Sequence, residues 1–398
     1  MPSPLFSEIE AGTTEAYVKD KVARTVFTAT PFLRMLKTNS KIFRRWEGGS
    51  YMKVPFDLQP VPSGAYSPGT DTFGLQQLQT QDAMEFSPRF YESEVVINAT
   101  VTDVYNMGPY KIFDILKQKY DNAANSLDSK FAAAIFNHGQ PRQTTVAQDR
   151  TKELNGFAEA INDGLTPSWT GDIFTTYGGQ TRNSAVLRNV LNSIPFWGGN
   201  SDGSAGQVSY QLLNATYNRC RTGKGLGDMV GGLPDYGLAS DFLYGQICAG
   251  VFPAQRVDVT GSETRSPSIG LAGLKFNNAI IFRDSYVPGT QNSIYVLDQS
   301  VLPSVTTGTF TLPASAAGQL NGFQNVATGT TINVNETFWW LNSDSWKFSY
   351  PTTGRYAFKN RGLENAYDGD MMADIIRAAA VLYCTFPGAN QLVYGFAG

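Results

Sequence analysis

The stretch that decides the fold is Tyr51-Met-Lys-Val-Pro-Phe-Asp-Leu58, followed after a charged, polar loop by Phe90-Tyr-Glu-Ser-Glu-Val-Val-Ile-Asn-Ala-Thr-Val-Thr102. Alternating apolar and polar residues predict that both segments are extended arms of one long hairpin. The hairpin contains too few apolar residues to form a core of its own. We therefore expect it to lie on another protein surface.

A long amphipathic helix follows the hairpin. Asn106 suits the N-cap, Pro109 suits the first turn, and Gly139 and Pro141 end the pattern. Apolar residues recur three or four positions apart, at Ile112, Leu116, Tyr120, Ala123, Leu127, Phe131 and Ile135. The opposite side carries Lys117, Lys119, Asp121, Asn125 and Asp128. At about 1.5 Å per residue, residues 109–137 span about 43 Å, which is as wide as a whole domain.

Composition narrows the class of protein. The 398 residues are 16% charged and 13% aromatic, whereas soluble domains average roughly 25% charged residues. Such a surface is typical of proteins that bury much of it against partners, although a β-rich domain with an aromatic core fits equally. The net charge of −3 does not indicate the basic surface that nucleic-acid binding requires.

Targeting signals and disulfides are not indicated. Cys220, Cys248 and Cys384 form no pair with zinc-site spacing. The N-terminus lacks the basic and apolar regions of a signal peptide, and no run of 18 apolar residues exists. The three Asn-x-Thr sequons are therefore interpreted as chance matches, and the chain is expected to fold in a reducing cytoplasm.

Charge is segregated along the N-terminal quarter. Residues 1–50 form a predicted arm, and residues 16–53 hold nine basic side chains against two acids, about +7. Residues 54–104 hold seven acids against Arg89, about −6. The acids are Asp57, Asp71, Asp82, Glu85, Glu92, Glu94 and Asp103. The two segments either attract one another or form two separate solvated faces.

The rest of the chain alternates helical, turn-rich and extended pieces. Short helices are predicted at Leu154–Ile161 and Ser209–Cys220, and strands at Leu274–Phe282 and Ile294–Leu297. Alternation in Thr307–Leu312 and Thr331–Asn335 indicates an inserted hairpin. Met371–Cys384 fits a helix or a buried strand equally well.

No catalytic, cofactor-binding or metal-binding residues are predicted. The only histidine, His138, is interpreted as a cap at the end of the long helix. Arg221-Thr-Gly-Lys-Gly-Leu-Gly227 is similar to a phosphate loop, but Asn218 replaces its first glycine and Gly225 its Ser/Thr. Asp368 and Asp370 are interpreted as solvated turn residues. We therefore expect that the protein is not an enzyme.

The order of elements resembles the major capsid proteins of tailed bacteriophages, which have the Hong Kong 97-like fold also found in encapsulin shells. Several stretches are similar individually: Tyr51–Phe56, Asp82–Glu92, Asp103–Asn106, Leu154–Gly164, Tyr177–Gly179, Gly273–Asn277, Ile294–Leu297, and Ala378–Cys384 with Pro387. The likeness covers essentially the whole chain, and the order of the pieces supports it more than any one piece does.

The resemblance implies an α+β fold with five parts. They are an N-terminal arm (1–50), an extended loop (51–104), a spine helix with the start of a peripheral domain (105–155), an axial domain (156–295), and the rest of the peripheral domain (296–398) with a hairpin inserted at about 304–336. It also implies that Met371–Cys384 is a strand.

The function implied is a major capsid protein that self-assembles as pentamers and hexamers into the icosahedral head shell around phage double-stranded DNA, without sequence-specific binding. Its implied partners are other copies of the chain, a separate scaffolding protein, a portal and a decoration protein, with no membrane and no cofactor. Its implied location is the virion, after assembly in the host bacterial cytoplasm. Lys53 is the only lysine in residues 51–104, which argues against covalent cross-linking through the extended loop.

In such a shell, the extended loop is expected to lie over a neighbouring subunit and to bury Tyr51, Phe56, Phe90 and Val95 there. Its acids are expected to face basic residues of that neighbour. Three other functions stay open at this point: an encapsulin-like shell that encloses cargo, a secreted β-rich adhesin or surface-layer protein, and a hydrolase around His138.

Overall fold

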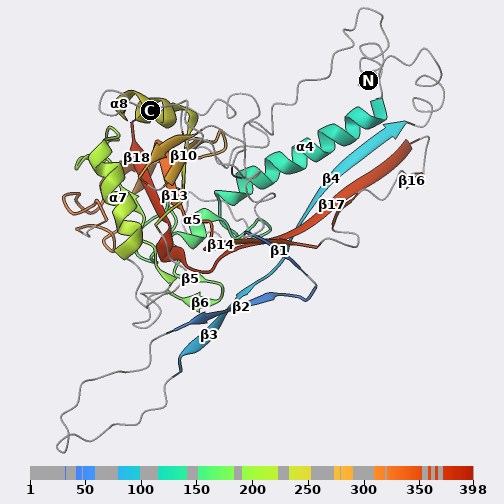
Figure 1. The fold of residues 1–398 in the computed structure, drawn as a ribbon, viewed down its shortest axis with the longest axis horizontal. Coiled ribbons are helices and arrows are strands. Elements are labelled where there is room, and N and C mark those ends of the chain that lie inside the picture. The colour runs from blue at the N-terminus through green and yellow to red at the C-terminus, as the bar shows by residue number, and fades with distance from the viewer. Residues whose placement is uncertain are drawn as a thin grey trace, which may run out of the picture.

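A computed structural model describes residues 32, 42–46, 48–58, 79–98, 115–140, 151–182, 191–222, 233–251, 273–277, 279–289, 309–318, 321–351, 357–359, 364–365 and 371–397. Figure 1 shows a body of sheet and helices from which a long ribbon and a helix project together. A second, shorter ribbon leaves the body in a different direction. The N-terminal arm, apart from a few positions, and the strand expected at Ile294–Leu297 lie outside the described residues.

The body is built on a six-stranded sheet in the order β7-β18-β13-β8-β10-β9. Its strands are β7 (Phe196–Trp197), β18 (Gln391–Phe396), β13 (Glu336–Leu341), β8 (Tyr236–Ala239), β10 (Ala279–Arg283) and β9 (Leu274–Phe276). β8 pairs parallel with β10 and β7 parallel with β18, whereas the other pairs are antiparallel. The strands β13 and β18 are buried at every position, as expected for a sheet covered on both faces.

Helices cover one face of this sheet. The apolar sides of α7 (Tyr210–Thr222) and α8 (Asp241–Val251) pack on Trp340 and Phe338. The sequence pattern predicted α7 to within two residues, and Leu213, Tyr217 and Cys220 are buried as expected. The other face carries Trp339 against the short helix α5 (Phe157–Ala160). α5 is shorter than the predicted Leu154–Ile161 because Gly156, its N-cap, lies directly against the end of the long helix.

The long ribbon belongs to a second six-stranded sheet centred on β17 (Met371–Cys384). β17 pairs antiparallel with β4 (Arg89–Asn98) over ten residues. It also pairs with β14 (Trp346–Tyr350), β15 (Ala357–Lys359) and β16 (Glu364–Asn365), and β14 pairs with β1 (Phe43–Arg45). Met371–Cys384 is therefore a strand, which confirms the choice made from the resemblance.

The helix α4 (Ile115–Ile135) runs along this ribbon (Figure 1). Its predicted apolar stripe is confirmed where it is described, since Ala123, Leu127, Phe131 and Ile135 are buried. The residues expected at its N-cap and first turn lie outside the described ranges. Asp128 was predicted on the solvent side and is instead 7% exposed, next to the buried Leu127, whereas Lys130 two residues later is exposed.

Two expectations about strands need correction. The second arm of the short hairpin is β3 (Gln81–Phe86), which pairs with β2 (Met52–Asp57), whereas the predicted arm Phe90–Thr102 contributes β4 to the β17 ribbon. The segment Leu274–Phe282 is two strands, β9 and β10, joined at Asn277, whose φ is 51°. A tight turn there leaves apolar side chains on both arms, which resembles one continuous strand in the sequence.

The predicted division into domains does not coincide with the sheets. β13 and β18 belong to the body sheet together with β8, although they lie after residue 295. β4 lies within the predicted extended loop, 51–104, but pairs with β17. Among the described strands, the chain crosses between the two sheets three times, between β4 and β7, at residues 342–345 and at residues 385–390, and sequence order cannot reveal such crossings.

The inserted hairpin is confirmed. β11 (Thr309–Thr311) and β12 (Thr331–Asn333) pair antiparallel, with Phe310 opposite Ile332. These two side chains are buried and the flanking threonines are exposed. This is the alternation that predicted the hairpin.

Candidate subunit-interaction surfaces

The β2–β3 hairpin has one buried face and one exposed face. Val54, Phe56, Met84 and Phe86 are each at most 8% exposed. On the opposite face, Lys53 lies directly across from Glu85 and forms an ion pair with it, at 3.1 Å between Nζ and Oε1. The hydrogen bond and charge of Glu85 raise the pKa of Lys53, which keeps this lysine protonated.

The buried face of the hairpin lies on the body of its own chain. The Phe86 ring meets Tyr177 edge-on at 5.2 Å between centroids and stacks on Tyr383 at 5.6 Å. The backbone N–H of Glu85 donates to the carbonyl of Gly178 at 2.9 Å. The expectation that Phe56 needs a neighbouring subunit is therefore wrong, since the chain itself covers the base of the hairpin.

The β4–β17 ribbon also has two different faces. Tyr91, Val95 and Ile97 point toward α4 and are buried, and the Tyr91 ring lies 4.5 Å from that of Phe131. Toward the same side, the Tyr120 hydroxyl donates to Asp374 at 2.7 Å. Val95, like Phe56, was expected to be buried by a neighbour and is buried within the chain.

The outer face of the ribbon exposes several large apolar side chains. Phe90 is 57% exposed, Val96 43% and Met371 53%. Glu92 and Arg377 face one another between them, at 3.8 Å between Oε2 and Nε. Tyr51, at the base of β2, is 47% exposed as well. Exposed large apolar side chains grouped on one face indicate an interaction surface, so Tyr51 and Phe90 remain candidates for burial between subunits.

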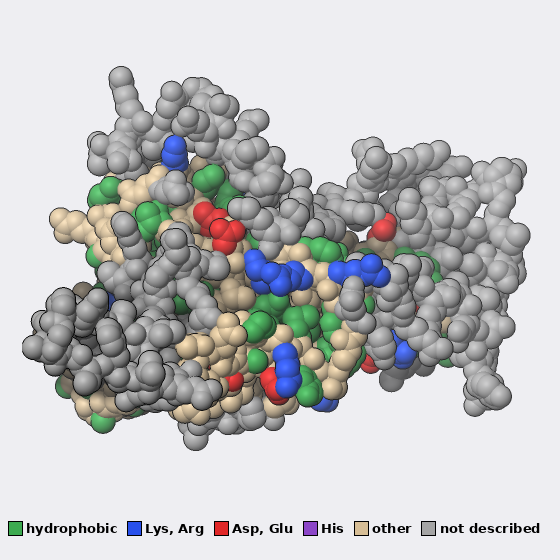
Figure 2. All heavy atoms as spheres, turned by 60° about the horizontal axis from the view of Figure 1, so that its bottom comes forward, with side chains coloured by type: hydrophobic (Ala, Val, Ile, Leu, Met, Phe, Trp, Pro, Cys, Tyr) green, Lys and Arg blue, Asp and Glu red, His purple; other side chains and the backbone are tan. Residues whose placement is uncertain are grey.

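A cleft opens beside this face. Its volume is about 540 Å³, and it lies between β4, α4 and residues 151–153. Charged residues of both signs line it, together with Phe90 and Leu127. In the view of Figure 2, hydrophobic side chains reach the described surface between lysine and arginine side chains. Such a mixture suits a protein partner better than a nucleic acid.

The acids of the hairpin region lie close to groups of their own chain. Asp82 accepts a hydrogen bond from the backbone N–H of Ala83 at 2.7 Å, while Glu85 and Glu92 contact Lys53 and Arg377. Glu94 lies on the exposed face of β4 opposite Ile375, and Asp71 lies outside the described residues. The expected contact of these acids with a neighbour's basic residues stays a prediction.

Comparison with solved structures identifies the fold class of this architecture. No family model and no curated protein matches the sequence. The capsid chain of cyanophage A-1(L) superposes with a TM-score of 0.58 at 12% identity, over 98% of this chain and 97% of that one. This chain has the fold of a capsid subunit.

Two further structures agree with that result. The encapsulin chain of the holo-SrpI complex from Synechococcus elongatus PCC 7942 gives a TM-score of 0.51 at 9% identity, over 95% of this chain and 92% of that one. The capsid of a native GTA particle gives 0.51 at 10% identity, over 96% and 94%. The α+β capsid fold expected from the sequence is confirmed, and each match covers more than nine-tenths of both chains.

In this capsid fold, His138 occupies a buried site rather than a helix cap. α4 ends at Ile135, and His138 lies three residues beyond it, fully buried. Its Nε2 lies 3.6 Å from Oδ2 of Asp172, and its ring packs on Phe174 at 4.9 Å. The interpretation as a C-terminal cap is wrong, because the chain turns inward after Ile135.

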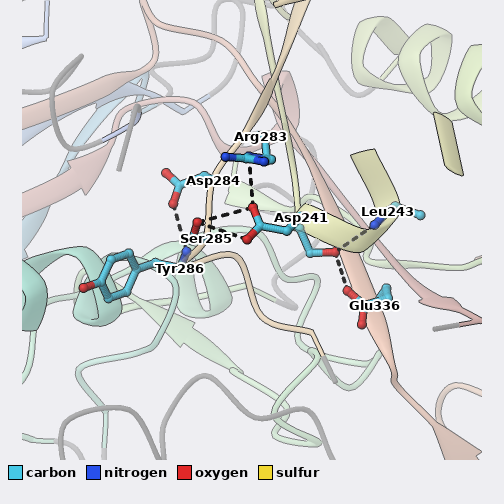
Figure 3. Close-up of polar contacts among 8 residues, drawn as sticks. Asp241, Leu243, Arg283, Asp284, Ser285, Tyr286 and Glu336 are labelled. Atoms are coloured by element: carbon cyan, nitrogen blue, oxygen red, sulfur yellow. Dashed lines mark hydrogen bonds and ion pairs between the residues drawn. The ribbon is translucent and has the colours of Figure 1, made fainter. Parts of the chain in front are cut away.

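A polar cluster gathers where the parallel strands β8 and β10 end (Figure 3). Sequence reasoning missed this cluster, since its residues lie far apart in the chain. Ser285 hydroxyl contacts both oxygens of Asp241, at 3.3 and 3.2 Å, and Arg283 Nε lies 3.3 Å from the same carboxylate. Ser240 hydroxyl donates to Glu336 and accepts from the N–H of Leu243. Each of these contacts joins one strand end to the start of α8 or β13.

Asp284 in this cluster also holds the N-terminal arm. Its carboxylate accepts the N–H of Tyr286 at 3.0 Å and that of Phe32 at 3.3 Å. Burial raises the pKa of Asp284 to about 7, and the charge of Asp241 acts in the same direction. Phe32 is itself buried and packs edge-on against Phe157 at 4.9 Å.

The described residues offer no constellation for catalysis. Ser285 faces a carboxylate but no histidine, and no three metal-ligating side chains come together within the described ranges. Residues 223–227 of the loop similar to a phosphate loop, as well as Asp368 and Asp370, lie outside those ranges. Among the described helices, none is long and apolar enough to cross a lipid bilayer.

Proposed function

We propose that this chain is the major capsid protein of a tailed bacteriophage and assembles as pentamers and hexamers into an icosahedral shell around double-stranded DNA. The observation that carries the proposal is the match to the cyanophage A-1(L) capsid chain over 98% and 97% of the two chains. A match that leaves almost no residue of either protein unaccounted for argues against a shared module within otherwise different proteins.

The exposed surfaces support assembly as the activity. The outer face of the β4–β17 ribbon presents Phe90, Val96 and Met371 to solvent. Burying these exposed apolar side chains against a second copy is favourable. Closed shells repeat each modest contact many times, so the interactions add up without any one interface being tight.

The proposal also includes finer parts. Shell assembly takes place in the bacterial cytoplasm with a separate scaffolding protein, a portal is incorporated, and the inserted β11–β12 hairpin is available to a decoration protein. The shell encloses DNA without reading its sequence, and the protein has no enzymatic activity.

A second candidate is an encapsulin-like shell that encloses a cargo protein. The observation that favours it is the match to the SrpI encapsulin chain over 95% and 92% of the two chains. In that case the particle would contain protein instead of a genome.

Electron microscopy of purified protein tests both candidates. Closed icosahedral particles of uniform diameter are expected, and nuclease-resistant DNA in particles from infected cells distinguishes the phage capsid from the encapsulin. Mass spectrometry that finds one abundant co-purified enzyme and no DNA would support the encapsulin. A chain that stays monomeric at every concentration and with every co-expressed phage protein would contradict both.

A further inference from the structure

The β5–β6 hairpin is a small element whose role is not explained by the fold. It consists of β5 (Thr176–Tyr177) and β6 (Gln180–Thr181), joined by Gly178 and Gly179. It is too short to add much to either large sheet. Its contacts instead converge on β3, the second strand of the β2–β3 hairpin.

Three contacts hold the base of the β2–β3 hairpin on this element. The carbonyl of Gly178 accepts the N–H of Glu85 at 2.9 Å, and the side-chain amide of Gln180 donates to the carbonyl of Ala83 at 3.0 Å. The ring of Tyr177 meets that of Phe86 at 5.2 Å. Two hydrogen bonds and one aromatic contact therefore hold β3 in one position on the β5–β6 hairpin.

Gly178 sets how closely β3 approaches. A Cβ at this position would lie 2.6 Å from Cβ of Met84 and 3.0 Å from Cζ of Phe86. Carbon atoms pack at about 3.5–4.0 Å, so any side chain here would push β3 away by about 1 Å. Gly179 also has a positive φ, +79° against +55° for Gly178, but a Cβ at Gly179 meets nothing within 4 Å.

The β5–β6 hairpin is itself fixed to the body by contacts of Arg182 and Cys384. The guanidinium of Arg182 lies 4.9 Å from the Tyr177 ring and is fully buried, donating to the carbonyl of Asn162 at 2.6 Å. The backbone N–H of Cys384, at the end of β17, donates to the Tyr177 hydroxyl at 2.8 Å. These contacts tie the β5–β6 hairpin to the sheet of the long ribbon.

A second tie leads to the end of α4. The side-chain amide of Gln140 donates to the carbonyl of Thr176 and to Glu159, each at 2.9 Å. The other oxygen of Glu159 accepts the N–H of Gly139 at 3.1 Å. The β5–β6 hairpin is thus fixed to the helix α4 and to the long ribbon on one side, and it contacts the β2–β3 hairpin on the other.

We propose that the β5–β6 hairpin is a rigid seat that sets the direction in which the β2–β3 hairpin leaves the subunit, and thereby the geometry in which a second copy of this chain can be engaged. The proposal rests on the proposed shell function. The seat contacts residues 83–86 of β3, whereas the opposite end of the described β2–β3 ribbon points away from the body (Figure 1). A small displacement at the base is magnified toward that end, because a strand rises about 3.4 Å per residue.

One glycine variant tests the seat, and a variant of the adjacent glycine serves as its control. Gly178→Ala and Gly179→Ala introduce the same side chain at adjacent positions of positive φ, but only the first contacts β3. In unassembled subunits, we expect amide exchange at Glu85 to become at least tenfold faster in Gly178→Ala and to stay within twofold of wild type in Gly179→Ala. In assembled samples, Gly178→Ala is expected to give fewer particles with a broader range of diameters.

A milder variant covers the case in which Gly178→Ala fails to fold. Gln180→Ala removes the hydrogen bond to Ala83 without adding any atom, and it should give a smaller rise in Glu85 exchange. Equal Glu85 amide exchange rates in the two glycine variants would contradict the proposal. An unchanged Glu85 exchange rate in both Gly178→Ala and Gln180→Ala would contradict it as well.

The outcomes also separate this proposal from the proposed function. If the wild-type chain forms no particles under any condition, the shell function fails, and Glu85 exchange still reports on the seat. If wild-type particles form and Gly178→Ala accelerates Glu85 exchange but gives particles of normal yield and diameter, the seat does not select the assembly geometry, and the proposal is wrong.

Discussion

Two antiparallel ribbons leave the body of this protein, and they are stabilised in different ways. The β4–β17 ribbon pairs over ten residues, and its inner face is covered along its length by α4. The β2–β3 ribbon pairs over six residues and is covered at its base by the β5–β6 hairpin and Tyr383. A ribbon backed by a helix behaves as part of the core. The β2–β3 ribbon has the shorter paired length and is fixed to the body mainly through β3, so its direction depends on fewer contacts.

The largest expected effect is on the helix-backed ribbon. Phe131 is 1% exposed and lies between Tyr91 and Phe348, at 4.5 and 6.3 Å between ring centroids. Phe131→Ala should lower the free energy of unfolding by about 3–5 kcal/mol because it leaves a cavity between helix and ribbon. Urea unfolding measures this loss. Lys130→Ala, one residue away on the exposed side, should change stability by less than about 0.5 kcal/mol. Similar losses in both variants would contradict the comparison.

A pH titration probes a third region, the polar cluster of the body. The pKa of Asp284 is raised to about 7 from an ordinary value of 3.8. The stabilisation from its protonated form is therefore complete below about pH 3.8 and is lost as the pH rises through about 7. At about 1.36 kcal/mol per pKa unit, the loss is on the order of 4 kcal/mol.

Asp284→Asn removes this titration and should flatten the decline in stability between pH 4 and pH 8. Thermal unfolding across that range measures it. Parallel pH profiles for wild type and Asp284→Asn would show that Asp284 is ionised throughout.

An identical chemical change, at Tyr91 in the β4–β17 ribbon and at Tyr177 in the β5–β6 hairpin that contacts β3, sharpens the comparison further. The Tyr177 hydroxyl accepts the N–H of Cys384 at 2.8 Å, and the Tyr91 hydroxyl accepts that of Leu154 at 3.0 Å. Tyr177→Phe and Tyr91→Phe each leave a buried N–H without this acceptor, which should lower the free energy of unfolding by about 1–3 kcal/mol.

The two tyrosine variants should differ in hydrogen exchange. Only Tyr177→Phe is expected to accelerate amide exchange in β3, because Tyr177 lies under Phe86. Faster exchange of β3 in Tyr91→Phe as well would mean that the two ribbons loosen together.

The smallest effect on subunit stability is expected on the outer face of β4. Phe90 is 57% exposed, so Phe90→Ser should change the free energy of unfolding by less than about 0.5 kcal/mol. Particle yield is expected to fall nonetheless, since a neighbouring copy then buries a hydroxyl instead of a ring. Sedimentation of assembled particles measures the yield. Normal yield would remove Phe90 from the assembly surface.

Much of the candidate surface was predictable because it depends on local periodicity. Spacing of three or four residues identified the buried side of α4, and strict alternation identified β11 and β12. Tyr51 and Phe90 were selected as surface anchors and are exposed, whereas Phe56 and Val95 were selected on the same grounds and are buried in the chain itself. Alternation tells which side chains share a face, but it does not tell what covers that face.

The sequence by itself therefore determined the elements of this protein: an extended segment at 51–58, a long amphipathic helix, an inserted hairpin, and the order typical of capsid subunits. Only the tertiary structure decided the partners of each strand. β4 pairs with β17, about 280 residues later, and not with β2. It also decided that Gly178 lies under Met84 and that Asp284 meets Phe32. Helix and strand patterns arise from neighbours in the chain, whereas strand pairing and close backbone contact depend on the whole packed core, in which distance along the sequence has no meaning.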